Sequence, residues 1–588
     1  MIDQIDFNKL EITLSNTKKK AAGLSIIRLF LFFGIMAVGI VGLSEIRLLL
    51  ILLPVLVGLF VYFIIEFNKQ KDKEAYLKEL IKMNEERLLR KERKLSSFNP
   101  GTEFQEKSHP FANDLDLFGE HSLYQLINHT VNKGGREKLV AKMKSSFNPK
   151  KAQMESKSIE ELAKKDTFLQ SFEALGRAFI KKEKSKEAFY DWIGTDLTWK
   201  SWLFIPMILG PLGGLAMLIG TVYFGMPFGW IGLWILLGGV FLATVFKPLQ
   251  EAAMLMPNQG DIKTFAFWSS LLVKEQFKNT HLKELQQAFK NEDIEAPKIL
   301  KSLEQKTFMI QNRLNLMYLI FNLLFWTDLF LWWRLILWKD KNGKYLSQWE
   351  KSFEEWQVLV SLSSFSNEEN LSCKVNWLDR EEIRVENLCH PLLHPQIAIG
   401  NDFKMKDSNH IVLLTGANMS GKTTFMRTLG INMVLANLGL SPFAKSFEMG
   451  SFQLFTSMRN SDNLGESVSS FYAELARIKL LLDTAESGVR VFFLLDEILK
   501  GTNTKDRIMG SEALIHQLYS AGGKGIISTH DIELSELETK LNYLVNKSFH
   551  SEITDQEIHF DYTIKDGPCP SFNAHKLMEL MGIRFNEN

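Results

Sequence analysis

The sequence predicts an α/β domain with a mostly parallel sheet, preceded by an all-α core domain that carries two transmembrane helical hairpins. From Asn376 onward, short apolar runs typical of buried strands alternate with helical patterns, which favours a mostly parallel sheet. Upstream of Asn376, helical patterns predominate, and four long apolar runs occur in two pairs.

Each apolar run is about as long as the ~20 residues that cross the hydrocarbon core of a bilayer. The first pair covers residues 21–43 and 48–67, and the second covers residues 202–224 and 228–246. A short turn separates the two members of each pair, so we expect two membrane-spanning hairpins. Two buried hairpins in a large soluble core are the alternative interpretation.

The distribution of basic residues predicts one topology. Lysines flank both hairpins on their open ends, whereas Arg47 is the single basic residue in the two turns. Since basic residues remain on the cytoplasmic side of a membrane, we expect a multi-pass protein of the inner (cytoplasmic) membrane. Its N-terminus, core and α/β domain would all lie in the cytoplasm, in contact with the lipid bilayer only through the hairpins.

A fifth apolar run, residues 314–338, is less suited to the membrane because it contains Asn315, Asn322, Asp328 and Arg334. A central Asp would cost roughly 2.5–3.5 kcal/mol in a spanning helix. A fifth crossing would also place the C-terminal domain outside the cell. We therefore expect a core helix or a helix lying at the membrane interface.

These features divide the chain into six segments. The first hairpin lies in residues 1–67 and is followed by a charged helix and linker, residues 68–109. The helical core comprises residues 110–200 and 248–375, on either side of the second hairpin in residues 201–247, and the α/β domain comprises residues 376–588. The expected strands of that domain are Ile411–Thr415, Phe452–Thr456, Val491–Leu495, Gly525–Ser528 and Ile558–Tyr562.

Overall composition adds little about partners. The 588 residues suggest about three or four domains. The 69 basic and 68 acidic residues nearly balance, so total charge does not point to a polyanion. Cys373, Cys389 and Cys569 are dispersed, which argues against both a disulfide framework and a zinc site.

The strongest motif is G-x-x-x-x-G-K-T, which follows the apolar run that ends at Leu414 and precedes a helical pattern. In this context the backbone N–H groups of a glycine loop surround phosphate oxygens at a helix N-terminus. Lys422 would reach the β- and γ-phosphates, and the Thr423 hydroxyl would bind Mg²⁺. We expect a P-loop ATPase domain of the ABC type, with ATP bound by Gly416, Ala417, Asn418, Met419, Ser420, Gly421, Lys422, Thr423 and Thr424.

Two further strands end in polar residues. The strand from Val491 leads into Asp496 and Glu497, and the strand from Gly525 leads to His530. Ligands bind at the carboxyl ends of such strands, so Asp496 is expected to hold Mg²⁺ and Glu497 to activate the attacking water. His530 would sense the γ-phosphate or position that water.

These motifs resemble those of the MutS family of DNA mismatch-repair ATPases. The likeness rests on the loop around Asn418-Met419, on residues 496–504 and on residues 528–531. Residues 467–475 are similar to the dimer-contact segment of that family. The resemblance implies a homodimer joined through the ATPase domain, in which Ser469 reaches the γ-phosphate bound by the partner.

The resemblance extends outside the ATPase motifs, with clear departures. Residues 116–136 look like the start of the family's helical core, and His390-Pro391-Leu392-Leu393 looks like the approach to its ATPase domain. The mismatch-sensing N-terminal domain is replaced by a hairpin, and Phe104-Gln105-Glu106 matches the family's wedge motif only in a short linker. The second hairpin stands where the family has its DNA clamp, and Ile397, Ala398 and Ile399 include no aromatic to stack on adenine.

The primary hypothesis is therefore a membrane-anchored, dimeric ATPase of the MutS type that uses ATP and Mg²⁺. A membrane-tethered protein that binds mismatched or branched DNA is the alternative. A transporter-like ATPase is weaker, because none of the four spans has a charged residue in its middle.

Overall fold

The computed structural model describes residues 4–106, 108–181, 187–291, 294–458, 470–553 and 558–570. The chain forms two compact units. The helical unit consists of Met1–Glu86, Thr130–Arg136 and Lys165–Val360, and the α/β unit consists of Arg87–His129, Glu137–Lys164 and Ser361–Asn588. The two units interleave along the sequence, and much of the segment expected to begin the helical core belongs to the α/β unit.

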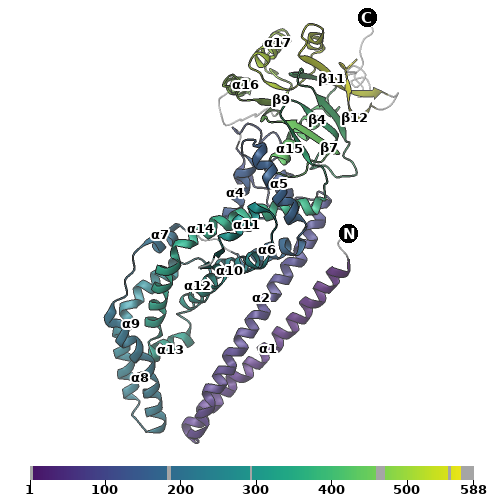
Figure 1. Ribbon diagram of the computed structural model, residues 1–588. Helices are drawn as coiled ribbons and strands as arrows, with labels where there is room; N and C mark the ends of the chain where they lie inside the picture. The colour runs from purple at the N-terminus through teal and green to yellow at the C-terminus, as the bar shows by residue number, and fades with distance from the viewer. Residues whose placement is uncertain are drawn as a thin grey trace. The chain divides into compact units, whose positions relative to one another are not determined.

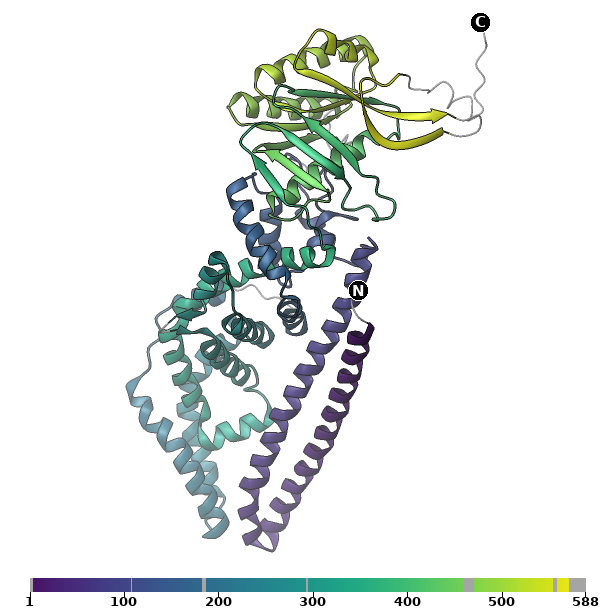
Figure 2. The same ribbon diagram turned by 45° about the vertical axis from the view of Figure 1, so that its right-hand side comes forward.

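The first hairpin of the helical unit consists of α1 (Gln4–Ser44) and α2 (Leu53–Lys91), which a 3-10 segment, Arg47–Leu52, connects. The two helices run side by side in opposite directions (Figures 1 and 2). Near the open end of the hairpin, Leu10 and Leu14 pack against Leu77 and Leu80. Closer to the turn, apolar side chains such as Phe30 and Leu48 are largely exposed.

The second hairpin consists of α8 (Phe204–Tyr223) and α9 (Gly229–Leu255), whose outer surfaces are also apolar and exposed. By length and composition alone, four helical segments of the described chain are long and apolar enough to cross a membrane: Phe7–Ser44, Leu48–Lys91, Ser201–Tyr223 and Gly229–Leu255. These coincide with the four apolar runs that the sequence analysis singled out.

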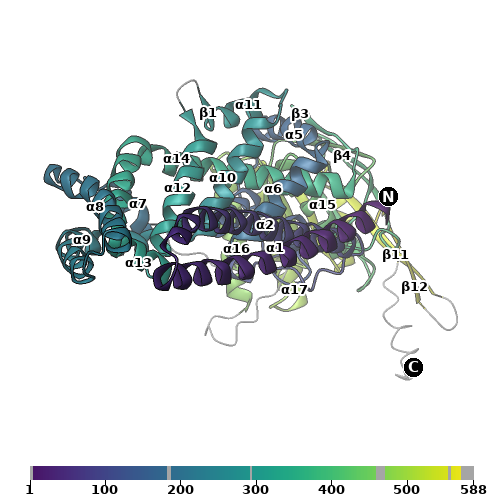
Figure 3. The ribbon, with the colours of Figure 1, turned by 90° about the horizontal axis from the view of Figure 1, so that it is seen from below.

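Aromatic side chains form the interior of the remaining helical unit. Helices α6 (Asp166–Phe179), α10 (Gln259–Lys274) and α12 (Ala296–Gln311) lie side by side (Figure 3). Phe172 stacks on Trp268 with ring centroids 4.4 Å apart, and Phe265 stacks on Phe353 at 4.9 Å. Phe353 belongs to the long helix α14 (Thr327–Glu369), and shorter helices α7 (Glu187–Gly194) and α11 (Thr280–Gln287) complete the unit.

The expectation of an all-α core is wrong at one place. Strands β1 (Lys290–Asn291) and β2 (Ile294–Glu295) form an antiparallel pair between α11 and α12. The connection between these helices is polar and short, and its backbone groups pair with each other where no helix continues.

The helix expected over residues 314–338 is broken into two helices. Helix α13 (Leu316–Phe325) ends at Trp326, whose φ of 53° is left-handed, and α14 then starts at an angle of 93° to α13. The Asn322 side chain accepts hydrogen bonds from the Asp328 N–H (2.8 Å) and the Thr327 hydroxyl (3.1 Å). These bonds cap the new helix, because its first N–H groups have no partner within it.

A six-stranded sheet forms the centre of the α/β unit, with strand order β12-β11-β6-β10-β9-β8. Strand β12 is antiparallel to β11, and the other neighbouring strands are parallel to each other. The mostly parallel sheet expected from the sequence is therefore present. Its strands are β6 (Ile411–Gly416), β8 (Gln453–Ser457), β9 (Val491–Asp496), β10 (Lys524–Thr529), β11 (Leu544–Ile553) and β12 (Ile558–Asp566).

A second sheet in this unit was not expected from the sequence. It has the order β3-β7-β4-β5 and consists of β3 (Val375–Leu378), β4 (Ile383–Leu388), β5 (Asn401–Met405) and β7 (Ser446–Gly450). The helices of the unit are α3 (Leu123–Ile127), most of α4 (Lys133–Met143), α5 (Pro149–Ala163), α15 (Lys422–Asn437), α16 (Ser470–Glu486) and α17 (Thr504–Ser520), together with the 3-10 helix Ile532–Thr539.

Candidate functional site

The glycine loop connects the buried strand β6 to the N-terminus of α15. Gly416, Met419 and Gly421 have φ values of 147°, 65° and 108°, so the loop turns sharply between strand and helix. A Cβ atom on Gly416 would lie 2.7 Å from the Phe549 carbonyl oxygen, so only glycine fits there. The Met419 side chain is exposed and points away from the protein interior. The backbone is therefore free to surround a ligand placed at the helix N-terminus.

Lys422, the first residue of α15, folds its side chain back over this loop. Its Nζ donates hydrogen bonds to the carbonyl oxygens of Gly416 (2.7 Å) and Ala417 (2.8 Å). Burial lowers the pKa of this ammonium group, and the nearby carboxylates of Glu497 and Asp496 oppose that shift. The cation is thus held within the loop, with two acidic groups close by.

Asp496, the last residue of β9, connects three elements of the α/β unit. The Thr423 hydroxyl donates to Asp496 Oδ2 at 2.7 Å. The hydroxyl of Ser528 in β10 donates to the other carboxylate oxygen. Because β6 and β9 both pair with β10, parallel register brings these side chains to the same edge of the sheet.

Glu497 follows in a left-handed conformation, with φ of 48°. Its Oε1 lies 2.7 Å from Nε2 of His530, and its Oε2 lies 2.6 Å from Nζ of Lys500. The hydrogen bond with His530, followed by the contact with Lys500, lowers the pKa of Glu497 to about 2. The carboxylate is therefore ionised at neutral pH and can accept a proton only from a strongly activated donor.

The structure thus brings together most of the residues singled out in the sequence. Lys422, Thr423, Asp496, Glu497 and His530 all lie at the carboxyl edge of the six-stranded sheet. Asn418 and Thr424 are exposed on either side of the loop. Ser469 lies outside the described residues.

These residues fit a triphosphate and Mg²⁺. Ser420 Oγ is buried in the loop without a hydrogen-bond partner, as expected of a group that awaits an oxygen ligand. Among the described residues, no three His, Cys, Asp or Glu side chains are arranged to hold a metal ion. Thr423 and Asp496 would supply oxygen ligands, which suits Mg²⁺ because this ion usually takes its other ligands from phosphates and water.

Some neighbours of the site were not assigned a role from the sequence. Ser528 fixes Asp496, and Lys500 pairs with Glu497. Glu474 of α16 accepts a hydrogen bond of 2.5 Å from the Leu499 N–H, and burial raises the pKa of Glu474. Arg507 of α17 binds Asp531 through two hydrogen bonds of 2.7 and 2.6 Å. For Ser528 and Asp531, their positions close to His530 in sequence could have indicated a place in the site.

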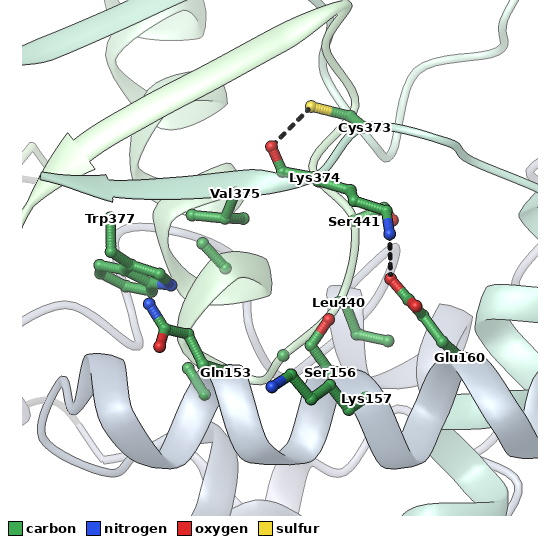
Figure 4. Close-up of a pocket in the computed structure, with 13 residues that line it drawn as sticks. Gln153, Ser156, Lys157, Glu160, Cys373, Lys374, Val375, Trp377, Leu440 and Ser441 are labelled. Atoms are coloured by element: carbon green, nitrogen blue, oxygen red, sulfur yellow. Dashed lines mark hydrogen bonds and ion pairs between the residues drawn. The ribbon is translucent and has the colours of Figure 1, made fainter.

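A separate pocket of the α/β unit contains none of these residues. It lies between α5, β3 and the C-terminal end of α15 (Figure 4). Gln153 and Trp377 face each other across it, and Lys374 pairs with Glu160 at 3.1 Å on its rim. Both members of this pair are well exposed to solvent, and the pocket has no buried charged group.

Comparison with known proteins assigns the α/β domain. The family model described as MutS domain V matches residues 412–583. The DNA mismatch repair protein MutS of Lactobacillus delbrueckii subsp. bulgaricus is 32% identical over 234 residues, 38% of this chain and 27% of that protein. The protein of the same name from Streptococcus mutans is 31% identical over 239 residues, 40% of this chain and 28% of that protein.

A third relative, the DNA mismatch repair protein MutS of Aquifex pyrophilus, is 30% identical over 222 residues, 36% of this chain and 26% of that protein. The chain therefore spans little more than a quarter of the length of these curated relatives. The matched region contains β6, the glycine loop and the strands that end at Asp496 and Thr529. Over residues 412–583, the chain therefore belongs to the family of MutS domain V.

Proposed function

We propose that this protein is a membrane-anchored MutS-family ATPase that binds and hydrolyses ATP with Mg²⁺ as a homodimer. The observation that carries the proposal is the convergence of Lys422, Thr423, Asp496 and Glu497 at one sheet edge, beside a loop with the geometry that phosphate binding requires. Nucleotide state would be coupled to the helical core through closure of the two ATPase domains.

Each residue then has a defined role. The loop N–H groups and Lys422 bind the phosphates and offset their charge, while Thr423 and Asp496 hold the metal ion. When bound, Mg²⁺ supplies positive charge that stabilises the charge developing on the phosphate oxygens. Glu497, held in place by His530 and Lys500, orients the attacking water and receives its proton. Preorganised charge lowers the barrier, with no covalent intermediate.

The dimensions of the hairpins support membrane anchoring in the inner (cytoplasmic) membrane. From Arg28 to Ser44, α1 extends about 24 Å, and from Gly229 to Lys247, α9 extends about 27 Å. Both lengths suit a hydrocarbon core of about 30 Å. At the base of the first hairpin, the Arg28 guanidinium lies 4.5 Å from the centroid of the Phe67 ring, where such a side chain reaches the interface. The exposed apolar side chains between base and turn would contact lipid.

The surface of α16 supports the dimer. Tyr472, Leu475 and Leu480 are exposed on this helix, close to the site through the bond between Glu474 and Leu499. Exposed apolar residues gathered on one surface are typical of protein contacts. By the resemblance to the family, Ser469 would reach the nucleotide bound by the partner.

The name shared by the relatives, DNA mismatch repair protein MutS, favours a second candidate function. In this version the protein is tethered to the membrane and acts on mismatched or branched DNA. It predicts binding that weakens steeply as salt is raised and a preference for distorted duplex.

An ATPase assay on the full-length protein in detergent tests both candidates. Hydrolysis is measured alone and with homoduplex, mismatched and branched DNA, and Lys422→Ala provides the inactive control. Mg²⁺-dependent hydrolysis that Lys422→Ala abolishes supports the ATPase. Stimulation by one DNA form supports the second candidate, and identical rates with all forms argue against it. Release of the protein from membranes by alkaline carbonate would contradict the anchoring.

A further inference from the structure

We propose that α13 and the first turns of α14 form a re-entrant element, which enters the cytoplasmic half of the bilayer beside the second hairpin and leaves on the same side. This inference rests on the proposed membrane anchoring of the hairpins. It concerns residues 313–333, a segment for which the sequence favoured a core or interface-lying helix.

The turn between α13 and α14 packs against three glycines of the hairpin. A Cβ atom on Gly210 of α8 would lie 2.9 Å from the Phe325 carbonyl oxygen. One on Gly214 would collide with the Leu324 carbonyl oxygen, and one on Gly238 of α9 would collide with the Trp326 indole. The turn therefore packs closely against α8 and α9 at positions where only glycine leaves room, as is common where helices approach each other in membranes.

Aromatic contacts also hold the turn against the two hairpin helices. The indoles of Trp234 and Trp326 stack with ring centroids 4.3 Å apart, and the Phe241 ring lies 5.4 Å from Trp326. Nε1 of Trp234 donates a 2.9 Å hydrogen bond to the Leu324 carbonyl oxygen. Helix α13 lies across α8 and α9 (Figure 1).

Positions along the hairpin show how deep the turn lies. Gly238 is about 13 Å from Lys247 at the base of α9, and Gly214 is about 13 Å from Tyr223 at the far end of α8. The turn therefore contacts the middle of the hairpin. In contrast, the Arg313 guanidinium lies 5.4 Å from the Phe246 ring, and the Trp333 ring lies 5.9 Å from the Phe204 ring. Phe246 and Phe204 both lie at the base, so the chain descends from the base and returns to it.

The charged residues of this segment neutralise each other. Nη2 of Arg313 lies 2.8 Å from Oδ2 of Asp328, and their side chains are only 8% and 3% exposed. The Tyr318 hydroxyl donates to Asp328 Oδ1 at 2.7 Å. Ionisable groups are tolerated at membrane depth when they pair with each other inside a protein. Because Asp328 is paired with Arg313, an Asp in the middle of this apolar run no longer argues against a position within the membrane.

The remaining surface of α13 is apolar and exposed. Leu316 is 70% exposed, and Leu314, just before the helix, is 83% exposed. This surface also includes Met317, Ile320 and Phe321, and the hairpin beside it likewise exposes apolar residues such as Leu212 and Leu236. Backbone groups at the break are hydrogen-bonded through Asn322, as a membrane environment demands. Because α13 packs against a hairpin that is proposed to face lipid, we take lipid acyl chains as the partner of this surface.

Site-directed spin labelling tests the depth of α13. The three native cysteines are replaced by alanine in the full-length protein, and single cysteines are placed at Phe321, at Leu236 of the hairpin and at Leu88 of α2. After reconstitution in phosphatidylcholine and phosphatidylglycerol vesicles, accessibility to oxygen and to a water-soluble nickel complex is measured. We expect oxygen to dominate at Phe321 and Leu236, and nickel to dominate at Leu88.

The outcomes separate this inference from the anchoring on which it rests. If nickel reaches Phe321 but not Leu236, the hairpin is in the membrane and the re-entrant element is wrong. If nickel reaches Leu236 as well, the proposed anchoring itself fails. Spin–spin broadening at Phe321, with low access for both reagents, would show that a second copy covers α13 and would also overturn the inference.

A labelling experiment distinguishes a re-entrant element from a full crossing. Single cysteines at Asn312 and Lys341, both exposed, are treated with a membrane-impermeant maleimide in inverted and right-side-out vesicles. We expect both to react only in inverted vesicles, from the cytoplasmic side. Labelling of the two positions from opposite sides would overturn the inference.

Discussion

Arg93 and Glu369 form a buried ion pair that joins the ends of two long helices within the α/β unit. Arg93 follows α2, and Glu369 is the last residue of α14. The guanidinium donates to Glu369 Oε1 at 2.7 Å and Oε2 at 2.9 Å, and its Nε donates to the Pro391 carbonyl oxygen at 2.8 Å. Both helices end in a left-handed residue nearby, with φ of 56° at Arg93 and 51° at Asn370.

Replacing Arg93 with alanine should destabilise the protein strongly. The substitution leaves the Glu369 carboxylate buried without its partner, and the loss of one member of a buried pair costs about 3–5 kcal/mol. We expect a markedly lower unfolding temperature in a tryptophan-fluorescence melt in detergent. Lys374→Ala, which breaks the exposed pair with Glu160, is the matched control and should change stability by less than about 1 kcal/mol. Equal shifts for the two variants would contradict the assigned importance of the Arg93 pair.

Lys422→Ala should abolish ATP hydrolysis and weaken nucleotide binding. The Lys422 ammonium group is folded over the glycine loop, and removing one such electrostatic contact typically reduces the rate about 100-fold or more. Hydrolysis and equilibrium binding of a fluorescent ATP analogue are both measured. Lys404→Ala, an exposed lysine of β5, should leave both unchanged. If Lys422→Ala hydrolysed ATP at the wild-type rate, the glycine loop would have no part in the mechanism.

Glu497→Gln should keep ATP bound while slowing hydrolysis about 100-fold or more, as expected for loss of a general base. The variant should also accumulate as a dimer when ATP and Mg²⁺ are present, which light scattering after size exclusion would detect. Since the pKa of Glu497 is about 2, the wild-type carboxylate needs no deprotonation between pH 5 and 8. Hydrolysis at the normal rate by Glu497→Gln would show that another group activates water.

Thr423 offers a test of the metal site with a conservative control. Thr423→Ser retains the hydroxyl that contacts Asp496 at 2.7 Å, whereas Thr423→Ala removes it. We expect Thr423→Ala to need a several-fold higher Mg²⁺ concentration for half-maximal hydrolysis, and Thr423→Ser to behave like the wild type. Identical Mg²⁺ dependence of all three proteins would exclude this hydroxyl as a metal ligand.

His390 should make stability depend on pH. Burial, with smaller contributions from Arg427 and His121, lowers its pKa from 6.5 to about 4. The unfolded chain therefore binds a proton that the folded chain does not, and stability that is complete above pH 6.5 falls as the pH approaches 4. The loss amounts to at most about 3 kcal/mol. Unfolding temperatures measured across this range should fall less steeply in His390→Asn, and equal slopes would refute the assignment.

The strands around the site could be predicted because their residues are buried on both faces. Strands β6, β9 and β10 are nearly continuous apolar runs, as in parallel sheets generally. Strand β11 gave no such signal, because it contains a polar residue at a buried position. Asn546 is buried there through hydrogen bonds to the Ser535 carbonyl oxygen (2.7 Å) and Glu538 (2.8 Å), partners that only the folded chain brings near.

In the site and in the fifth apolar run, too, single residues could be predicted, whereas features that depend on the folded chain could not. The motif residues could be identified individually, but the contact of Glu497 with Lys500 depends on left-handed turns at Glu497 and Leu499. Neither proline nor glycine stands beside Trp326 to indicate the break in the sequence. Besides the local cap by Asn322, the turn packs against Gly210, Gly214 and Gly238, which are distant along the chain.

The interleaving of the two units has a consequence for biosynthesis. The helical unit is completed at Val360, whereas the α/β unit begins at Arg87 and needs strands made after Ile411. A ribosome therefore releases the first pieces of the α/β unit hundreds of residues before their partners exist, and those pieces must wait unfolded or be held by chaperones. For the same reason, a fragment that begins at residue 376 would lack α3, α5 and the segment around Arg93. Such a truncated protein should aggregate on expression, whereas the intact chain should not.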